Sequence, residues 1–198
     1  MRRFAVIVLA AGGSSRMGRP KQLEQVGGMT LVERAARTAL GCGAAEVVVV
    51  LGAVAEEVKS ALEGLPVRPT VNDSWRDGLG SSIAHGVSSM SPAVDAVILT
   101  LADQPFVTSE HLRALAANPA DIVATAWDSE SGPPCLFASR FFPELVALAG
   151  DRGAKSVIRR HGAALVNLEG ASLDIDAPED LATAQGLLHL LVIEESGN

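Results

Sequence analysis

The residues best suited to chemistry lie close to the start of the chain. Arg16, Arg19 and Lys21 follow the glycine- and serine-rich segment Gly12–Ser15, which itself follows the apolar run Phe4–Ala11. Glycine lets a backbone approach a ligand closely because no Cβ stands in the way. Successive main-chain N–H groups and nearby cations can together neutralise a polyanion. The pattern therefore predicts a phosphate-binding loop at the end of a buried strand.

Two common nucleotide-binding motifs do not fit this loop. Gly13 and Gly18 have the spacing of a P-loop, but Arg19-Pro20 stands where that motif needs Lys and a magnesium-binding Ser or Thr. The dinucleotide fingerprint G-x-G-x-x-G would need a glycine at Ser15. It also needs an acidic residue at the end of the second strand, where the chain has Leu51-Gly52. The sequence argues against a P-loop NTPase and against a Rossmann oxidoreductase.

Two carboxylates are candidate magnesium ligands. Asp103 directly follows the apolar segment 93–102, at the carboxyl end of a predicted central strand, where parallel sheets bind their ligands. Mg²⁺ is usually held by one or two carboxylates plus phosphate oxygens. Beside a polyphosphate site, Asp103 is therefore better explained as a metal ligand than as a turn residue before Pro105. Asp176 either caps the last helix together with Glu179 or is the second metal ligand, and both roles stay open.

Hydrophobic periodicity places these residues on alternating strands and helices. Apolar runs predict strands at 4–11, 46–51, 67–71, 93–102, 121–126, 135–138 and 163–168. Helices are predicted at 30–40, 54–62, 81–88, 108–117, 141–148, 154–161 and 178–191, and residues 127–134 are predicted to form a polar loop over the site. This alternation predicts an α/β fold with a mostly parallel sheet and helices on both faces.

Composition and charge exclude several classes of protein. A length of 198 residues fits one domain, residues 1–198, and 48% hydrophobic content is that of an ordinary globule. A net charge of −7 argues against a general nucleic-acid binder. No stretch approaches the roughly 20 apolar residues of a membrane span. Cys42 and Cys135 lie far apart and predict reduced thiols in a cytoplasmic protein.

A series of motifs carries a resemblance to a known family. Leu9–Lys21 matches the nucleotidyltransferase signature L-A-A-G-x-S-x-R-M-G-x-x-K at every fixed position. Further motifs follow in order over nearly the whole chain: Asn72-Asp73-Ser74-Trp75, Gly78-Leu79-Gly80-Ser81-Ser82, Leu101-Ala102-Asp103-Gln104-Pro105, Gly150-Asp151-Arg152-Gly153-Ala154 and Asp174-Ile175-Asp176-Ala177-Pro178-Glu179-Asp180. The chain thus resembles the molybdenum cofactor cytidylyltransferase family, among the molybdopterin-guanine dinucleotide synthase-like nucleotidyltransferases. The resemblance implies the three-layer, Rossmann-like fold of nucleotide-diphospho-sugar transferases.

The same resemblance implies a reaction and roles for the residues. CMP would pass from CTP to the phosphate of molybdenum-bearing molybdopterin, with pyrophosphate released. Positioning and electrostatic stabilisation would carry such a transfer, without a covalent intermediate. Lys21 would contact the α-phosphate, Arg16 would hold pyrophosphate, and Asp103 with Asp176 would hold Mg²⁺. The implied nucleotide-binding residues are Leu9, Ala10, Ala11, Gly12, Gly13, Ser14, Ser15, Asn72, Gly78, Ser81 and Ser82.

The sequence also leaves alternatives at the base and acceptor ends of the site. Asn72 and Ser81-Ser82 could form only a turn and a helix cap; the resemblance favours a substrate-facing loop. Leu9–Gly12 reads Leu-Ala-Ala-Gly, as in cytidine-using members, whereas guanosine-using relatives tend to have Leu-Ala-Gly-Gly. One methyl group beside a base discriminates by only about 1–3 kcal/mol. Gly132-Pro133-Pro134 stands where the family often has Gly-His-Pro, which places the acceptor's identity in question.

Two other functions fit parts of the pattern. One is a related NTP transferase that acts on a sugar or polyol phosphate. The other is a non-catalytic carrier that binds the molybdenum cofactor and passes it to a recipient, a molybdoenzyme or its maturation factor. A carrier has no need of Arg16, Lys21 and Asp103 together, so their presence favours an enzyme.

Overall fold

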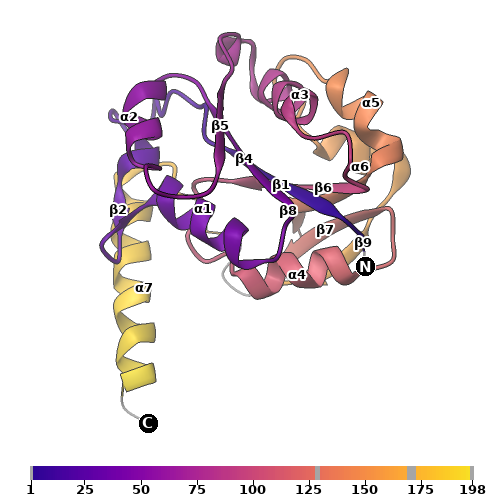
Figure 1. The fold of residues 1–198 in the computed structure, drawn as a ribbon. Helices are drawn as coiled ribbons and strands as arrows, with labels where there is room; N and C mark the ends of the chain where they lie inside the picture. Colours follow the sequence, from indigo (N-terminus) through magenta and orange to yellow (C-terminus); the bar gives the residue numbers. More distant parts are fainter. Residues whose placement is uncertain (1, 128–129, 169–172, 197–198) are drawn as a thin grey trace.

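The computed structural model describes residues 2–127, 130–168 and 173–196, and its centre is a seven-stranded sheet (Figure 1). The strand order is β5-β4-β1-β6-β8-β7-β9. The bounds are Phe4–Leu9 (β1), Glu46–Leu51 (β4), Arg68–Val71 (β5), Ala96–Leu101 (β6), Ile122–Trp127 (β7), Glu130–Ala138 (β8) and Ala164–Asn167 (β9). β8 runs antiparallel to β6 and β7, while the other pairs are parallel. The predicted mostly parallel α/β sheet is confirmed.

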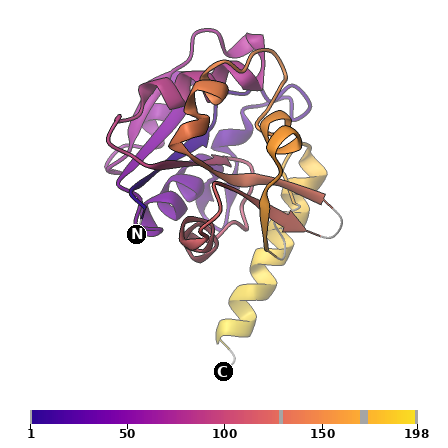
Figure 2. The same ribbon diagram turned by 90° about the vertical axis from the view of Figure 1, so that its right-hand side faces the viewer.

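Helices cover both faces of the sheet and complete three layers (Figure 2). One face carries α1 (Leu31–Gly41), α2 (Ala55–Ser60) and α4 (Ser109–Ala117), and the other carries α3 (Leu79–Ser89), α5 (Phe142–Val146) and α6 (Lys155–His161). Successive side chains of a strand point to opposite faces. In β1, Val6 and Val8 therefore pack with α1, while Ala5 and Ile7 pack with α3. A strand buried on both faces explains the continuous apolar run in the sequence.

The helix starts follow the expected capping chemistry, with one shift. The Oγ1 of Thr30 accepts a hydrogen bond from the N–H of Glu33 at the start of α1, and Thr108 does the same for His111 at the start of α4. The predicted start of α3 at Ser81 is wrong by two residues. Gly78 has φ 98° and lies directly before Leu79, so the chain reverses at the glycine and the helix begins at once.

The segment predicted as a polar loop is largely a strand. Residues 128–129 lie outside the described part, but Glu130 already pairs with Trp127 in the β7–β8 ladder. The register of this ladder shifts between Ala124 and Thr125, and Pro133-Pro134 falls in that irregularity. Proline cannot donate to a ladder and is tolerated where a bulge removes the need for a donor. The prediction of a loop is therefore wrong for residues 130–134, which form the first half of β8, whereas the strand predicted at 135–138 is its second half.

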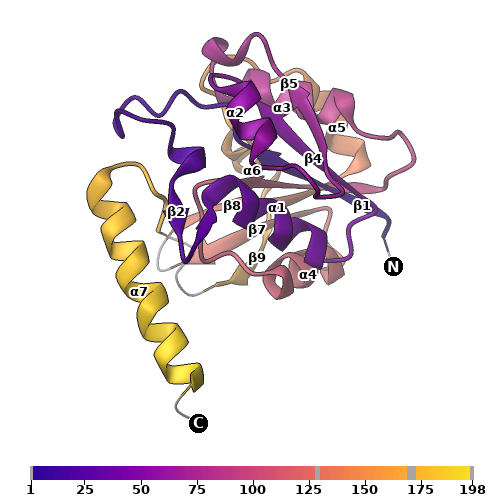
Figure 3. The same cartoon turned by 60° about the vertical axis from the view of Figure 1, so that its left-hand side comes forward.

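A hairpin and the last helix extend the fold beyond the main sheet. β2 (Gln25–Val26) and β3 (Met29–Thr30) pair antiparallel, and α7 (Pro178–Ser196) runs beside them and projects from the body (Figure 3). A third apolar cluster joins them: Met17, Val26, Leu31, Ile175, Leu181 and Ala184. The start of α7 is thereby attached to the first loop. Among the described residues, no helix is long and apolar enough to cross a membrane, and both cysteines are free and buried.

Two helix glycines offer a matched test of packing. A Cβ at Gly86 in α3 would lie 2.8 Å from Ile7 Cγ2 and 2.9 Å from Val50 Cγ2, whereas a Cβ at Gly186 in α7 would meet no atom within 4 Å. We expect Gly86→Ala to lower the free energy of unfolding, because overpacking costs about 1–3 kcal/mol. Gly186→Ala should raise it by about 0.5–1 kcal/mol. Urea unfolding of both variants tests this, and equal effects would contradict it.

Candidate active site

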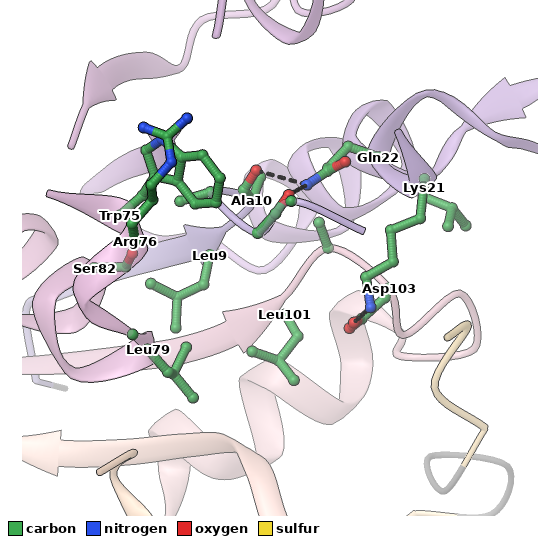
Figure 4. Close-up of a pocket in the computed structure, with 16 residues that line it drawn as sticks. Leu9, Ala10, Lys21, Gln22, Trp75, Arg76, Leu79, Ser82, Leu101 and Asp103 are labelled. Carbon is green, nitrogen blue, oxygen red and sulfur yellow. Dashed lines mark hydrogen bonds and ion pairs between the residues drawn. The ribbon is translucent and has the colours of Figure 1, made fainter. Parts of the chain in front are cut away.

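The predicted phosphate-binding loop lies at the carboxyl ends of the parallel strands, beside a cavity of about 380 Å³ (Figure 4). Loops that follow β1, β5 and β6 line this cavity, at the edge where open α/β sheets bind ligands. Nine of the predicted site residues are among the lining: Leu9, Ala10, Ala11, Gly12, Gly13, Lys21, Gly78, Ser82 and Asp103. Ser14, Ser15, Arg16, Asn72, Ser81 and Asp176 are not part of the lining.

The backbone of the first loop is attached to β4 and leaves its amide groups free. The N–H of Ala10 donates to Val50 O (2.9 Å), and the N–H of Ala53 donates to Ala11 O (3.2 Å). A Cβ at Gly52 would lie 2.4 Å from Ala11 O, so glycine is required for this close approach. Among the described residues, the N–H groups of 12–15 have no hydrogen-bond acceptor. These four donors are available to a polyanion.

Lys21 lies between the two predicted metal ligands. Its Nζ donates to Asp103 Oδ2 (2.5 Å) and to Asp176 Oδ1 (2.7 Å), and the side chains of Lys21 and Asp103 are each only 16% exposed. Arg16 is 76% exposed and donates from Nη1 to the other oxygen of Asp176 at 2.9 Å. The structure thus brings Arg16, Lys21, Asp103 and Asp176 into one cluster of alternating charge.

This cluster shifts the pKa values of its members. Burial alone would lower the pKa of Lys21, but the Asp103 and Asp176 carboxylates outweigh burial and raise it above the ordinary lysine value. The hydrogen bond from Lys21 and the charge of Arg16 hold the pKa of Asp176 below its usual range. At neutral pH Lys21 is therefore a protonated cation paired with ionised Asp176.

The donor set fits a divalent cation completed by substrate. Asp103 Oδ1 is buried and has no hydrogen-bond partner among the described residues, so one oxygen of this carboxylate is unused. No group of three or more His, Cys, Asp and Glu side chains in that part of the chain is arranged to hold a metal. Mg²⁺ commonly takes one or two carboxylates and fills its other positions with water and phosphate oxygens. Asp103 and Asp176 match that requirement.

A short strap, residues 173–176, carries Asp176 to the site. The N–H of Ile175 donates to Asp103 O (2.9 Å), and the Ile175 side chain is fully buried in the third apolar cluster. Asp180, rather than Glu179, caps α7, because its Oδ2 accepts the N–H groups of Asp176 (3.0 Å) and Ala177 (2.8 Å). The Asp176 carboxylate is consequently engaged by Lys21 and Arg16 instead of by the helix end.

The second predicted loop is held together by its own polar groups. Asn72 is 4% exposed, and its Nδ2 donates to Ser81 Oγ (3.0 Å) and Ser82 Oγ (3.1 Å). Its Oδ1 accepts the N–H of Ser74 (3.1 Å). Ser81 Oγ in turn donates to the Gly78 carbonyl (2.8 Å). The turn interpretation therefore explains these contacts, while Ser82 and Gly78 also line the cavity.

Sequence reasoning missed an aromatic wall of the cavity. Trp75 and Arg76 both line it, and the Arg76 guanidinium lies 4.4 Å from the centroid of the Trp75 ring. A Cβ at Gly13 would lie 3.1 Å from the Trp75 ring, which is an independent reason for glycine in the loop. Leu79 is 39% exposed and lines the cavity as well. The motif that contains Trp75 is recognisable in the sequence, but residue spacing alone does not predict that Trp75 lies against Gly13.

Asp174 and Gln104 form a second missed pair, beside the charged cluster. Gln104 is 5% exposed, and its Nε2 donates to Asp174 Oδ1 and to Pro133 O, both at 3.1 Å. Partial burial and the nearby Asp103 carboxylate raise the pKa of Asp174 to about 6. At neutral pH the ionised Asp174 adds a third negative charge close to Lys21.

The raised pKa of Asp174 predicts a pH-dependent effect on stability. The folded protein binds this proton more tightly than the unfolded chain, so ionisation destabilises the fold fully above about pH 6 and not at all below the unfolded pKa near 4. Asp174→Asn should therefore stabilise the protein at pH 7.5, by less than about 1 kcal/mol because the residue is partly exposed. Urea unfolding with EDTA at pH 7.5 and 4 measures this. An equal effect at both pH values, or the same effect in Asp73→Asn, would contradict it.

Comparison with known proteins places the chain in a family. Residues 6–165 match the model of the MobA-like NTP transferase domain. Nicotine blue oxidoreductase of Paenarthrobacter nicotinovorans is 35% identical over 196 residues, which cover 93% of this chain and 95% of that protein. Purine catabolism protein PucB of Bacillus subtilis (strain 168) is 31% identical over 192 residues, which cover 88% and 92%.

Solved structures confirm the predicted type of fold. Rv0371c from Mycobacterium tuberculosis H37Rv is 26% identical with a TM-score of 0.82, over 93% of this chain and 98% of that one. The same protein in complex with manganese is 25% identical with a TM-score of 0.80, over the same shares of both chains. The matched residues include the predicted phosphate-binding loop, Lys21 and Asp103. The chain therefore belongs to the MobA-like NTP transferase family.

Proposed function

We propose that this protein transfers CMP from CTP to the phosphate of molybdenum-bearing molybdopterin and releases pyrophosphate. The observation that carries the transferase chemistry is the Lys21 ammonium, held by Asp103 and Asp176 beside the free N–H groups of Gly12–Ser15. CTP is supported by Leu-Ala-Ala-Gly at residues 9–12, and the pterin acceptor by the order of the motifs along the chain. Membership of the NTP transferase family supports the reaction class.

The site residues suit attack of one anion on another. An oxygen of the acceptor phosphate forms a bond to the α-phosphorus, while the bond from that phosphorus to the bridging oxygen breaks and pyrophosphate leaves with its electron pair. In this proposal, Lys21 would donate to an α-phosphate oxygen after giving up its hydrogen bond to one carboxylate. The N–H groups of Gly12–Ser15, which are unpaired among the described residues, and the exposed Arg16 would bind the leaving phosphates.

Asp103 and Asp176 are the residues that would hold Mg²⁺. Bound there, the ion would neutralise charge on the phosphates of the triphosphate. Support comes from the unused Asp103 Oδ1 and from the manganese complex of Rv0371c, a relative with this fold. Lys21 and a divalent ion would share the same two carboxylates, so binding of either alters the position of the other.

Removal of the Lys21 ammonium should abolish most of the turnover. Lys21→Ala is expected to lower the rate of pyrophosphate release by roughly 10²–10³-fold, the scale of losing one transition-state donor. Lys59→Ala is the matched control, since Lys59 lies exposed on α2. Pyrophosphate release should be assayed with CTP, Mg²⁺ and the acceptor, below the unfolding temperature of each variant. Near wild-type turnover in Lys21→Ala would remove Lys21 from the mechanism.

Nucleotide preference distinguishes a cytidylyltransferase from related transferases that use another nucleotide. Thermal unfolding with CTP, GTP, ATP and UTP, with and without Mg²⁺, should show the largest magnesium-dependent shift with CTP. A ligand at 100 times its dissociation constant adds about 2.7 kcal/mol to stability. The shift should be lost in Asp103→Ala. A larger shift with another nucleotide would contradict CTP and favour a transferase that acts on a sugar or polyol phosphate.

Two further outcomes would overturn the transferase itself. Binding of the molybdenum cofactor with no pyrophosphate release would indicate a carrier that serves a recipient molybdoenzyme. The name of the Paenarthrobacter nicotinovorans relative raises a redox reaction as a second candidate. Reduction of nicotine blue by NADH or NADPH, without pyrophosphate release from CTP, would favour that candidate, although the first loop lacks a dinucleotide fingerprint.

A further inference from the structure

Gln22 lies under the phosphate-binding loop and bonds to it at several points. It follows Lys21 in a 3-10 turn, residues Lys21–Leu23, and is 3% exposed. Its Nε2 donates to Ala10 O (3.1 Å) and to Gly12 O (2.6 Å), as Figure 4 shows. Its Oε1 accepts from Ser14 Oγ (3.2 Å). One side-chain amide thus uses both donors and its acceptor on a single loop.

These bonds determine which way the peptide groups of the loop face. With the carbonyls of residues 10 and 12 directed at Gln22, carbonyl oxygens are kept from the phosphates, which they would repel. The N–H groups of residues 12–15 have no acceptor among the described residues and so remain available to a ligand. Ser14 holds φ 53°, a left-handed conformation that a non-glycine residue keeps only when its surroundings require it.

The same bonds connect the loop to Lys21. Ser14 Oγ donates to Gln22 and accepts the main-chain N–H of Lys21 (3.0 Å). The loop and the turn that carries Lys21 are therefore held in register by two adjacent contacts. The Lys21 side chain is held separately, by Asp103 and Asp176. Loss of the Gln22 amide would thus disturb the loop first and the ammonium less.

We infer that Gln22 is a positioning residue, which holds the loop in the form that binds the triphosphate. This inference rests on the proposed function, because the triphosphate is the ligand that the loop serves. Gln22 acts through the peptide groups of the loop, since its own donors and acceptor are already bonded within the protein.

The test compares two glutamines that each donate to a backbone carbonyl. Gln22→Met keeps the length of the side chain and removes the amide. Gln185→Met is the control, because Gln185 Nε2 donates to Gln25 O (3.1 Å) at an exposed position of α7. Inorganic tripolyphosphate with Mg²⁺, titrated by calorimetry, probes the loop without any base or acceptor, and CTP is titrated in parallel. We expect the dissociation constant for both to rise about tenfold in Gln22→Met and to stay within twofold in Gln185→Met.

A second variant separates positioning from general damage to the fold. Gln22→Glu places a carboxylate against the carbonyls of Ala10 and Gly12 at pH 8, whereas a protonated carboxyl can donate one hydrogen bond to them. The ratio of its dissociation constant to that of the wild type should fall as the pH is lowered from 8 to 5.5. This variant carries the test if Gln22→Met does not fold. A ratio independent of pH, or equal binding by Gln22→Met and wild type, would overturn the inference.

The two probes distinguish failure of this inference from failure of the proposed function. If wild type binds tripolyphosphate but not CTP, and Gln22→Met binds tripolyphosphate weakly, the inference stands and the cytidylyltransferase proposal falls. If CTP binds and turns over, yet Gln22→Met binds both probes as wild type does, the proposed function stands and the inference falls. If wild type binds neither probe, both are overturned.

Discussion

The ion cluster of Lys21, Asp103 and Asp176 is the interaction on which the rest of the site depends. Its three members come from the 3-10 turn after the first loop, the end of β6 and the strap before α7, so the cluster forms only when distant segments of the chain have met. Partly buried charges are tolerated only in mutual compensation, because an unpaired one costs several kcal/mol. The third apolar cluster, which includes the fully buried Ile175, supplies the packing that holds the strap in place.

The positive and negative groups of the site come from different segments of the chain. The first loop contributes cations and free N–H groups, while the strand end and the strap contribute carboxylates. Ligand phosphates would pair with the cations and N–H groups, and a divalent ion would pair with the carboxylates. Either one alone would leave the other set of groups unpaired. The protein is acidic overall, with a net charge of −7, so the proposed anionic substrate would be attracted by these local cations and N–H groups and not by the overall charge.

Much of the fold could be predicted because its signals are local. Continuous apolar runs indicated β1, β4 and β6, and Thr30 and Thr108 marked the starts of α1 and α4. The second half of β8, residues 135–138, was predicted, but its first half was not, because the prolines there lie at a register shift that periodicity does not reveal. The start of α3 was misplaced because the sequence indicates Ser81 as the helix cap. The helix in fact begins directly after Gly78, which has a positive φ that the sequence does not reveal.

By itself, the sequence determined the chemical character of the site: a glycine-rich loop after a buried strand, cations beside that loop and an aspartate at the end of a later predicted strand. Tertiary structure decided which of these groups meet. In the structure Asp180 caps α7, so the Asp176 side chain is free to pair with Lys21. Trp75 lines the cavity, and Asp174 and Gln104 lie beside the ion cluster. The physical reason is the sequence distance over which each signal acts. Propensity and spacing report on residues a few positions apart, whereas Lys21 and Asp176 are separated by 155 positions and meet only because the core packs.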